Sequence, residues 1–552
     1  MHEWIRQDRR IHGIGLPGGG EIKTSGFADD SALYVGDPDS LASIRTALDM
    51  YCRASAASLN HDKTVGVMLG GHAQWVQPHM RVDTWVTDRD CERYLGAYFG
   101  EPDQVREQWD KAINKMKSRE AKWALRELSL YGRCLVHKAS IASCLWFMCT
   151  VMDTPEHARV EMKGLMDKMI WRGGVHLIKH EVCCMPQAYG GFKKMDTDAQ
   201  LLARQASWGK RYLDPECPGR WVNIVREWLR EGGMGPEMWV AGRGRRALRS
   251  VDSSNLPRFW KECIKAMWKV RPRRIAGADP NHCSIHTHQF QTVTIVDYCT
   301  VQYNNVKWEP LSAMTVKLAY WSIIRYRWGV PIPVGRTRWE QRGAVADWPF
   351  AWSNVRCDSV TKKQAGRSLK LMHCVGQASS RLCAVADCHC GVGGRVSMWH
   401  GVFECEVARR AWRRVEEWWH RLGGRSDVSD PIHKLTVVDR GRGGEVEAEV
   451  WRLLCACMLD ILWVGWTRWV HEGAVMVIDS ILRGWEALVL ERVEILWTRA
   501  VRLSSEYDRH IDYVPGCIWS KPKVDHMGNF SRSWEGPLGR IVQGRWVPTR
   551  LV

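Results

Sequence analysis

The chain has no long hydrophobic run and no hydrophobic leader. Its longest apolar stretch, Leu453 to Trp466, is about 14 residues long and contains Asp460, so it is too short to cross a membrane. The first residues, MHEWIRQDRRIHG, are polar and lack the apolar centre of a secretory signal. The sequence therefore predicts an intracellular protein, nuclear or cytoplasmic, with no membrane partner.

Several enzyme and scaffold signatures are also absent. The chain contains no G-x-x-x-x-G-K-[ST] phosphate loop, no nucleophile elbow and no protein-kinase motif set. Its 20 cysteines are scattered, and their spacing indicates reduced thiols, not a disulfide framework. Phenylalanine is scarce, with 9 residues against 32 tryptophans, many of which fall at helical spacing and are expected to anchor the core.

Positive charge is what the chain has in excess. Lys and Arg number 79 against 61 Asp and Glu, which gives a formal net charge of +18 and a pI near 9.2. Such an excess attracts phosphate backbones and favours a nucleic-acid partner, although a basic protein without one is the alternative. At 552 residues the chain has room for two to four domains of roughly 100–200 residues each.

Two adjacent aspartates, Asp29 and Asp30, form the first candidate site. Residues 22–35 read as strand, tight turn and strand with the aspartates at the tip, and a helix capped by Asp39 or Ser40 is expected over 37–60. Neighbouring carboxylates repel unless a cation neutralises them, and Mg²⁺ prefers such oxygen ligands. A solvated Asp-Asp turn is the alternative for the pair taken alone.

The order of motifs around this pair resembles the palm of LINE-type (non-LTR) reverse transcriptases. Phe27-Ala28-Asp29-Asp30 is followed by the expected helix, then by Leu59-Asn60-His61-Asp62-Lys63-Thr64, then by Tyr94-Leu95-Gly96. The resemblance continues through Leu128-Ser129-Leu130-Tyr131-Gly132-Arg133, Ile170-Trp171-Arg172-Gly173-Gly174, Pro186 and Gly190-Gly191-Phe192, which are similar to the thumb of that family.

This resemblance implies RNA-directed DNA polymerase activity. Asp29 would ligate the Mg²⁺ (or Mn²⁺) ions, Asp30 would be its neighbour in the turn, and Lys63 would lie near the incoming triphosphate, a surface lysine being the alternative. RNA template and DNA primer would be the partners, and the thumb residues Arg133 and Lys138 would face their backbones. Only about two dozen residues precede Phe27, whereas the fingers and another palm aspartate should lie upstream, so we expect this chain alone to be inactive.

The second candidate site is a cysteine and histidine cluster near residue 400. Cys388, Cys390, His400 and Cys405 follow the spacing C-x-C-x9-H-x4-C, which suits one tetrahedral Zn²⁺, with Cys383 or His389 as a possible replacement ligand. Free cysteines in a cysteine-rich chain are the alternative. An Ala-Arg-Arg-Ala-Trp helix follows, and the whole is similar to the zinc-binding region behind the thumb in LINE-type reverse transcriptases. That region usually opens with C-x2-C, so the choice among Cys383, Cys388 and Cys390 stays open.

Together these patterns predict an α+β fold. Residues 1–100 would be a partial palm of antiparallel strands and one helix, 101–210 a helical thumb, and 211–370 a mainly helical connection. Residues 371–425 would form the zinc-knit module, and 426–552 a helical region with a tail. The oligomeric state is not specified by any of these patterns.

Overall fold

The computed structural model describes most of the chain and divides it into two compact units. One unit comprises Met1–Trp123, Lys138–Met166 and Asp196–Gly329, and the other comprises Ala124–His137, Asp167–Met195 and Val330–Val552. The residues described are 1–16, 19–67, 84–86, 91–100, 102–214, 216–217, 219, 221–231, 239, 256–271, 273–274, 298–301, 308–375, 385–391, 393–421, 430–436, 444–511, 527, 530, 538–543 and 545–548.

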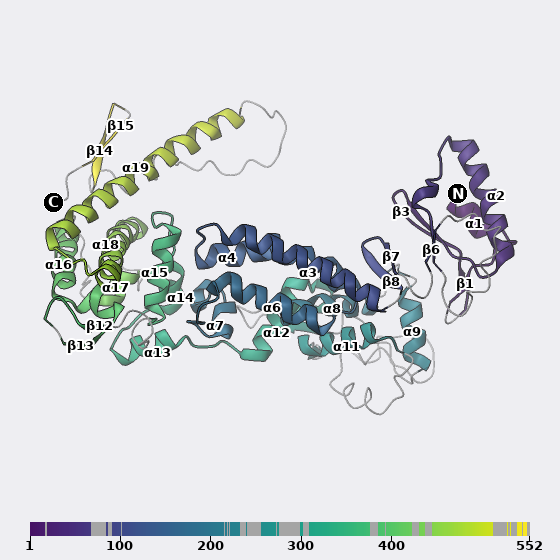
Figure 1. Ribbon diagram of the computed structural model, residues 1–552, viewed down its shortest axis with the longest axis horizontal. Helices are drawn as coiled ribbons and strands as arrows, with labels where there is room; N and C mark the ends of the chain where they lie inside the picture. Colours follow the sequence, from purple (N-terminus) through teal and green to yellow (C-terminus); the bar gives the residue numbers. More distant parts are fainter. Residues whose placement is uncertain are drawn as a thin grey trace. The chain divides into compact units, whose positions relative to one another are not determined.

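The first unit opens with small antiparallel strand pairs and a covering helix (Figure 1). Helix α1 (His2–Gln7) precedes the pair β1 (Ile14–Gly15) and β2 (Glu21–Ile22), the hairpin β3 (Thr24–Phe27) and β4 (Asp30–Leu33), and α2 (Pro38–Ser55). Ile5, Ile11 and Ile44 are fully buried between these elements. Apolar side chains of α1, α2 and the intervening chain thus hold the hairpin on a small core.

Helix α2 is capped by Asp37, whose carboxylate accepts a hydrogen bond from the Ser40 backbone N–H. The expectation that Asp39 or Ser40 caps this helix is wrong, because both lie inside its first turn. Pro38 fits the first helical position, where its missing N–H costs no hydrogen bond.

A short turn and two strand pairs complete this part of the first unit. A short turn η1 (His61–Lys63) leads to β5 (Val65–Val67), which pairs in parallel with β6 (Thr84–Val86). The hairpin of β7 (Cys91–Tyr94) and β8 (Ala97–Gly100) follows. Its two-residue turn, Leu95 and Gly96, has φ values of 48° and 85°, the left-handed pair that suits the twist of a hairpin.

Helices form the rest of the first unit. They are α3 (Pro102–Ala124), π-helix η3 (His137–Ile141), η4 (Ala142–Cys144), α5 (Trp146–Val151), α6 (Glu156–Trp171), α8 (Thr197–Leu213), α9 (Trp221–Glu231), α11 (Arg258–Val270), η9 (Leu311–Ala313) and α12 (Val316–Trp328). The last residues of α6, from Asp167 on, belong to the second unit. A sheet of β9 (Arg273–Arg274), β10 (Tyr298–Val301) and β11 (Trp308–Pro310) accompanies them. Helix α8 packs on α11 and α12 through small buried residues such as Ala199, Ala203 and Gly209, which let the helices approach closely.

The second unit is also mainly helical. It contains α4 (Leu130–Val136), α7 (His180–Cys184), η5 (Gln187–Tyr189), α13 (Val334–Gln341), α14 (Trp348–Asn354), α15 (Lys362–Met372), β12 (Val385–Asp387), β13 (Gly393–Val396), π-helix η10 (His400–Glu404), α16 (Glu406–Arg421), α17 (Pro431–Leu435), α18 (Gly444–Glu472), α19 (Ile478–Ile511), β14 (Gly539–Val542) and β15 (Arg545–Pro548). Within residues 172–195, the chain forms the short helices α7 and η5.

Helix α18 is the centre of this unit. It contacts α15, α16, α17 and α19, which surround it in Figure 1, and its residues Leu453 to Leu459 are fully buried. Within the described residues, it is the one helix long and apolar enough to cross a membrane by length and composition, from Ala448 to Glu472, and 67% of its apolar window is buried. The helix is longer than the apolar run seen in the sequence. It is apolar because the neighbouring helices bury it in the core of the unit.

The α+β class is confirmed, with small strand pairs among predominant helices. Antiparallel strands are predicted from the sequence, and the described strand pairs are antiparallel except for β5 with β6. The limits proposed for the five regions stay predictions.

Candidate metal centre and acidic hairpin

Two of the candidate metal ligands, Cys388 and Cys390, lie in the turn that joins β12 to β13. The turn is closed by Gly391, whose backbone N–H donates to the Cys388 carbonyl oxygen at 3.0 Å. Gly391 has a φ of +82°, a conformation that a side chain would strain. The turn therefore holds the thiols of Cys388 and Cys390 close to each other at the end of the strand pair.

The other two candidate ligands frame the π-helix η10. His400 is its first residue, and Cys405 follows its last residue and directly precedes α16. The Cys405 backbone N–H donates to the His400 carbonyl oxygen at 2.7 Å, which fixes the separation of the two residues. Because Cys405 sits at the start of α16, its sulfur also faces the backbone N–H groups of Val407 and Ala408.

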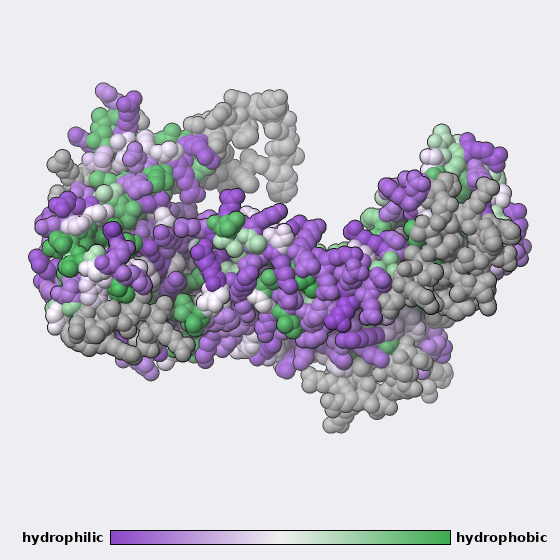
Figure 2. All heavy atoms as spheres, viewed as in Figure 1, coloured by the Kyte–Doolittle hydropathy of each residue, from purple (hydrophilic) through white to green (hydrophobic). Residues whose placement is uncertain are grey.

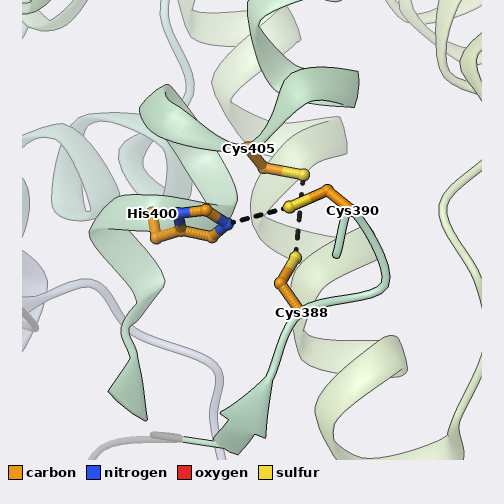
Figure 3. Close-up of side chains that lie close together, drawn as sticks. All are labelled: Cys388, Cys390, His400 and Cys405. Carbon is orange, nitrogen blue, oxygen red and sulfur yellow. Dashed lines mark hydrogen bonds between the residues drawn. The ribbon is translucent and has the colours of Figure 1, made fainter. Parts of the chain in front are cut away.

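The four side chains converge, as Figure 3 shows. Their ligand atoms all lie within 4.8 Å of one another. The Sγ atoms of Cys388 and Cys405 are 3.8 Å apart, and Cys390 Sγ is 3.5 Å from His400 Nε2. In a tetrahedral zinc site, bond lengths of about 2.3 Å to sulfur and 2.0 Å to nitrogen give edges of roughly 3.8 Å and 3.6 Å. The two measured separations match these edges, so the cluster could hold a metal such as zinc.

Burial sets the electrostatics of the cluster. Cys388, His400 and Cys405 are buried and Cys390 is half-buried. Burial raises the pKa of the Cys388 thiol to about 12 and raises that of Cys405, and it lowers the pKa of His400. Without a cation the site therefore favours neutral thiols and a neutral imidazole. A bound metal ion would reverse the balance at sulfur, since it stabilises thiolates.

Two tryptophans of α18 pack against the histidines at the cluster. Trp466 lies edge-on to the His400 ring at 6.1 Å, and Trp469 lies edge-on to the His389 ring at 5.4 Å. A Cβ added to Gly401 would lie only 2.1 Å from the Trp466 ring, so only glycine permits this approach. The indole of Trp412 in α16 donates to the Val402 carbonyl oxygen at 2.8 Å, which ties η10 to the helix that follows.

The sequence therefore identified all four residues that the structure brings together. Cys383, the alternative ligand, lies outside the described residues. His389 lies beside the cluster without belonging to the four-donor group. Trp466 and Trp469 could not be linked to the cluster from the sequence, because more than sixty residues separate them from the first cysteine and only the fold brings them near.

The hairpin of β3 and β4 carries the two aspartates as the sequence predicts. Ala28 and Asp29 form its turn, with Ala28 at a φ of 54°, and Asp30 pairs with Phe27 at the start of β4. Both carboxylates are exposed. Among the described residues, neither aspartate belongs to a group of three or more potential metal ligands. The described part of the chain therefore does not complete a Mg²⁺ site.

The same hairpin is held by a histidine that the sequence did not single out. His2 Nδ1 lies 2.5 Å from Thr24 Oγ1 in β3, and its Nε2 lies 3.2 Å from Ser31 Oγ in β4. A Cβ on Gly26 would lie 2.6 Å from the same ring. The imidazole thus bridges the two strands next to the aspartate turn.

Lys63 lies at the end of the turn η1 and is exposed. Its backbone N–H donates to the side-chain oxygen of Asn60 at 3.1 Å, and the Thr64 hydroxyl donates to the Asn60 carbonyl oxygen at 2.8 Å. The Asn-x-x-Lys-Thr pattern is therefore a loop organised by Asn60. A role of Lys63 near a triphosphate stays a prediction.

The thumb candidates differ in their surroundings. The guanidinium of Arg133 donates to the carbonyl oxygens of Leu128 at 3.0 Å and Ile170 at 2.6 Å, and burial lowers its pKa. It therefore links α4 to the end of α6 within the second unit. Lys138 is a half-buried residue of η3. Contact of either residue with a nucleic-acid backbone stays a prediction.

Comparison with known proteins gives one distant relative. No protein-family model matches the chain. The chain is 23% identical over 256 residues, 45% of its length, to a protein of Xenopus laevis described as the transposon TX1 uncharacterized 149 kDa protein. It covers 19% of that larger protein, and the likeness is therefore to one part of a transposon protein.

Proposed function

We propose that this chain derives from a non-LTR retrotransposon and is a portion of its reverse transcriptase. The observation that carries the proposal is the acidic hairpin, with Asp29 in a two-residue turn between β3 and β4. The helix α2, the Asn60–Lys63 loop and the β7–β8 hairpin follow it in the order expected of a palm. The distant likeness to a transposon protein supports the same origin.

The proposed reaction is RNA-directed DNA synthesis with an RNA template, a DNA primer and Mg²⁺ or Mn²⁺. Asp29 would contribute one carboxylate to the metal site, Asp30 would border it, and Lys63 would approach the triphosphate. A two-metal site needs carboxylates on both sides of the ions. Since the described residues do not supply that further ligand, we propose that the chain acts as part of a larger catalytic unit.

The cluster of Cys388, Cys390, His400 and Cys405 is proposed to bind structural zinc. All four positions of a tetrahedral ion would be filled by protein, which leaves none for a substrate. The metal would join the β12–β13 turn to η10 and the start of α16. It would thus stabilise a segment whose strands are only three and four residues long.

Manganese binding tests the acidic hairpin directly. Electron paramagnetic resonance counts free Mn²⁺ in the presence of the chain and of its Asp29→Asn variant. We expect the substitution to remove one weak binding event, whereas Asp39→Asn, at an exposed residue of α2, leaves binding unchanged. Equal binding by all three proteins would reject the hairpin as a metal site.

Primer extension tests the reaction itself. The assay contains the chain, an RNA template with an annealed DNA primer, deoxynucleotides and Mg²⁺ or Mn²⁺. We expect no extension by the chain alone. Template-dependent synthesis that Asp29→Asn abolishes would support the polymerase and overturn the need for further residues.

A second candidate is a non-catalytic, nucleic-acid-binding zinc protein derived from such an element. The formal net charge of +18 favours it. Its distinguishing result is nucleic-acid binding that weakens steeply with salt and is unchanged by Asp29→Asn.

A further inference from the structure

The Cys/His cluster contains a fifth potential donor, His389. It lies between two of the four proposed ligands in the sequence, and the turn after β12 directs its ring toward the thiols. His389 Nδ1 is 3.7 Å from Cys388 Sγ, and its Nε2 is 3.8 Å from Cys405 Sγ. Each separation is close to the sulfur–nitrogen edge of roughly 3.6 Å in a tetrahedral zinc site, and the two involve different nitrogens of the ring.

The fold holds this imidazole as it holds that of His400. The rings of Trp466 and Trp469, one turn apart on α18, lie 4.8 Å from each other. Trp466 contacts His400 and Trp469 contacts His389, both in an edge-on geometry. The two imidazoles are therefore positioned by one tryptophan pair, with the thiols beside them.

The four proposed ligands differ in how well they are protected. Cys388, His400 and Cys405 are buried, whereas Cys390 is half-buried. Cys390 is thus the ligand that solvent-borne reagents reach most readily. The contacts of His389 in the cluster are to the sulfurs of the other two cysteines, Cys388 and Cys405.

We propose that His389 is a reserve metal ligand that replaces Cys390 when this thiolate is lost. The site then has two ligand sets. One is Cys388, Cys390, His400 and Cys405, and the other is Cys388, His389, His400 and Cys405. Replacement requires the His389 ring to rotate so that one nitrogen faces both shared sulfurs, because Nδ1 now lies beside Cys388 and Nε2 beside Cys405. The inference rests on the proposed metal site. It adds that the site keeps its metal ion when Cys390, its most accessible ligand, is lost.

Cobalt substitution distinguishes the two ligand sets, because the charge-transfer absorption of Co²⁺ scales with the number of bound thiolates. The full chain should show three-thiolate absorption. Cys390→Ser should still bind Co²⁺ with about a third less of this absorption, as two thiolates replace three in a tetrahedral set. The double variant Cys390→Ser/His389→Ala should bind at least tenfold more weakly. His389→Ala alone should leave the spectrum unchanged.

The matched control is Cys390→Ser/His420→Ala, in which an exposed histidine of α16 is removed instead. It should bind Co²⁺ as Cys390→Ser does. Equal binding by Cys390→Ser with and without His389 would overturn the reserve-ligand proposal. Failure of the unaltered chain to bind Co²⁺ or Zn²⁺ would reject the metal site itself, which is a separate outcome.

A second measurement avoids substituting Cys390, in case that variant does not fold. The zinc-loaded chain is treated briefly with iodoacetamide, and native mass spectrometry with peptide mapping follows the metal content of molecules alkylated at Cys390. We expect these molecules to keep one zinc ion in the unaltered chain and to lose it in His389→Ala. Loss of zinc from both proteins would contradict the proposal.

Discussion

At the scale of single residues, the described structure contains close approaches that allow little substitution. Gly401 is the tightest of these near the metal cluster, because the Trp466 ring occupies the space of a Cβ. His373 is a second case, since it is buried and its ring packs against Trp352 at a centroid distance of 4.7 Å. At Gly401 the space left by the indole limits substitution. At His373 burial makes a positive charge on the ring unfavourable. Each leads to a measurable prediction.

We predict that Gly401→Ala destabilises the second unit by at least about 1–3 kcal/mol, the usual cost of inserting a group into a packed site. The added methyl would lie 2.1 Å from two atoms of the indole, so η10 or α18 must move. Thermal unfolding followed by tryptophan fluorescence measures the effect. The matched control is Gly366→Ala in α15, where nothing lies within 4 Å and alanine suits a helix better. Equal melting temperatures for the two variants would contradict the close packing.

Acid should weaken the second unit through His373. Burial lowers the pKa of this imidazole to about 4, whereas its unfolded value is about 6.5. The unfolded chain therefore binds the proton more readily between these values, so stability is full above pH 6.5 and falls as the pH drops toward 4. The expected loss between pH 7 and pH 5 is about 2 kcal/mol.

The measurement is the urea midpoint of the second unit at both pH values. His373→Gln serves as the comparison, because an amide can still donate to the Gly190 carbonyl oxygen, which His373 Nε2 reaches at 2.8 Å, but does not titrate. The variant should lose about 2 kcal/mol less than the unaltered chain over this range. An identical pH dependence would show that His373 is not the group responsible.

At the scale of elements, sequence patterns were informative wherever local rules decide the structure. The Asp29 turn and the C-x-C-x9-H-x4-C spacing were both recognisable in the sequence, because turn chemistry and ligand spacing act over a few residues. The cap of α2 was assigned wrongly, although Pro38 directly after Asp37 is a local signal for it.

What the sequence could not supply is the long-range pairing of elements. Nothing local says that Trp466 and Trp469 of α18 stand behind His400 and His389, or that α18 is a 29-residue core helix. The same holds for His2, whose contact with Ser31 spans 29 residues. Such contacts depend on how apolar faces assemble, which periodicity alone does not specify.

Metal removal should act on specific elements. The η10 turn and the first turn of α16 depend on the Cys388–Cys405 region, whereas α3 belongs to the other unit. We predict that chelation speeds amide exchange about tenfold or more at residues 400–409 and leaves α3 unchanged, because structural zinc contributes folding free energy to the segment it joins. Uniform acceleration, or none, would contradict a local structural ion.

At the scale of the whole molecule, the excess of positive charge predicts a nucleic-acid partner, and a particular surface can be proposed for the contact. Helix α3 offers such a surface, because Lys111, Lys115 and Lys122 recur at steps of four and seven residues on its exposed face. They span roughly 16 Å along one side of the helix. Hydrophilic side chains predominate along α3 in Figure 2. Among the acidic residues of this helix, Glu107 pairs with Lys111 at 2.9 Å, and Glu120, near its end, is buried.

We predict that this lysine stripe contacts nucleic-acid phosphates. Each phosphate contact releases counterions and adds about 0.7 (single strand) to 0.9 (duplex) to the slope of log K against log salt. Replacing Lys111, Lys115 and Lys122 by alanine should therefore lower the slope by roughly 2–3, as fluorescence anisotropy of a labelled primer–template measures it over a salt series.

The control triple is Lys163→Ala, Lys362→Ala and Lys363→Ala, three exposed lysines on α6 and α15 that remove the same net charge. If net charge alone drives binding, both triples lower affinity equally, because long-range attraction depends on the sum of charges. If α3 makes discrete phosphate contacts, only its own triple reduces the slope. Equal slopes in the two triples would thus remove α3 as the contact surface while leaving the basic chain as a nonspecific binder.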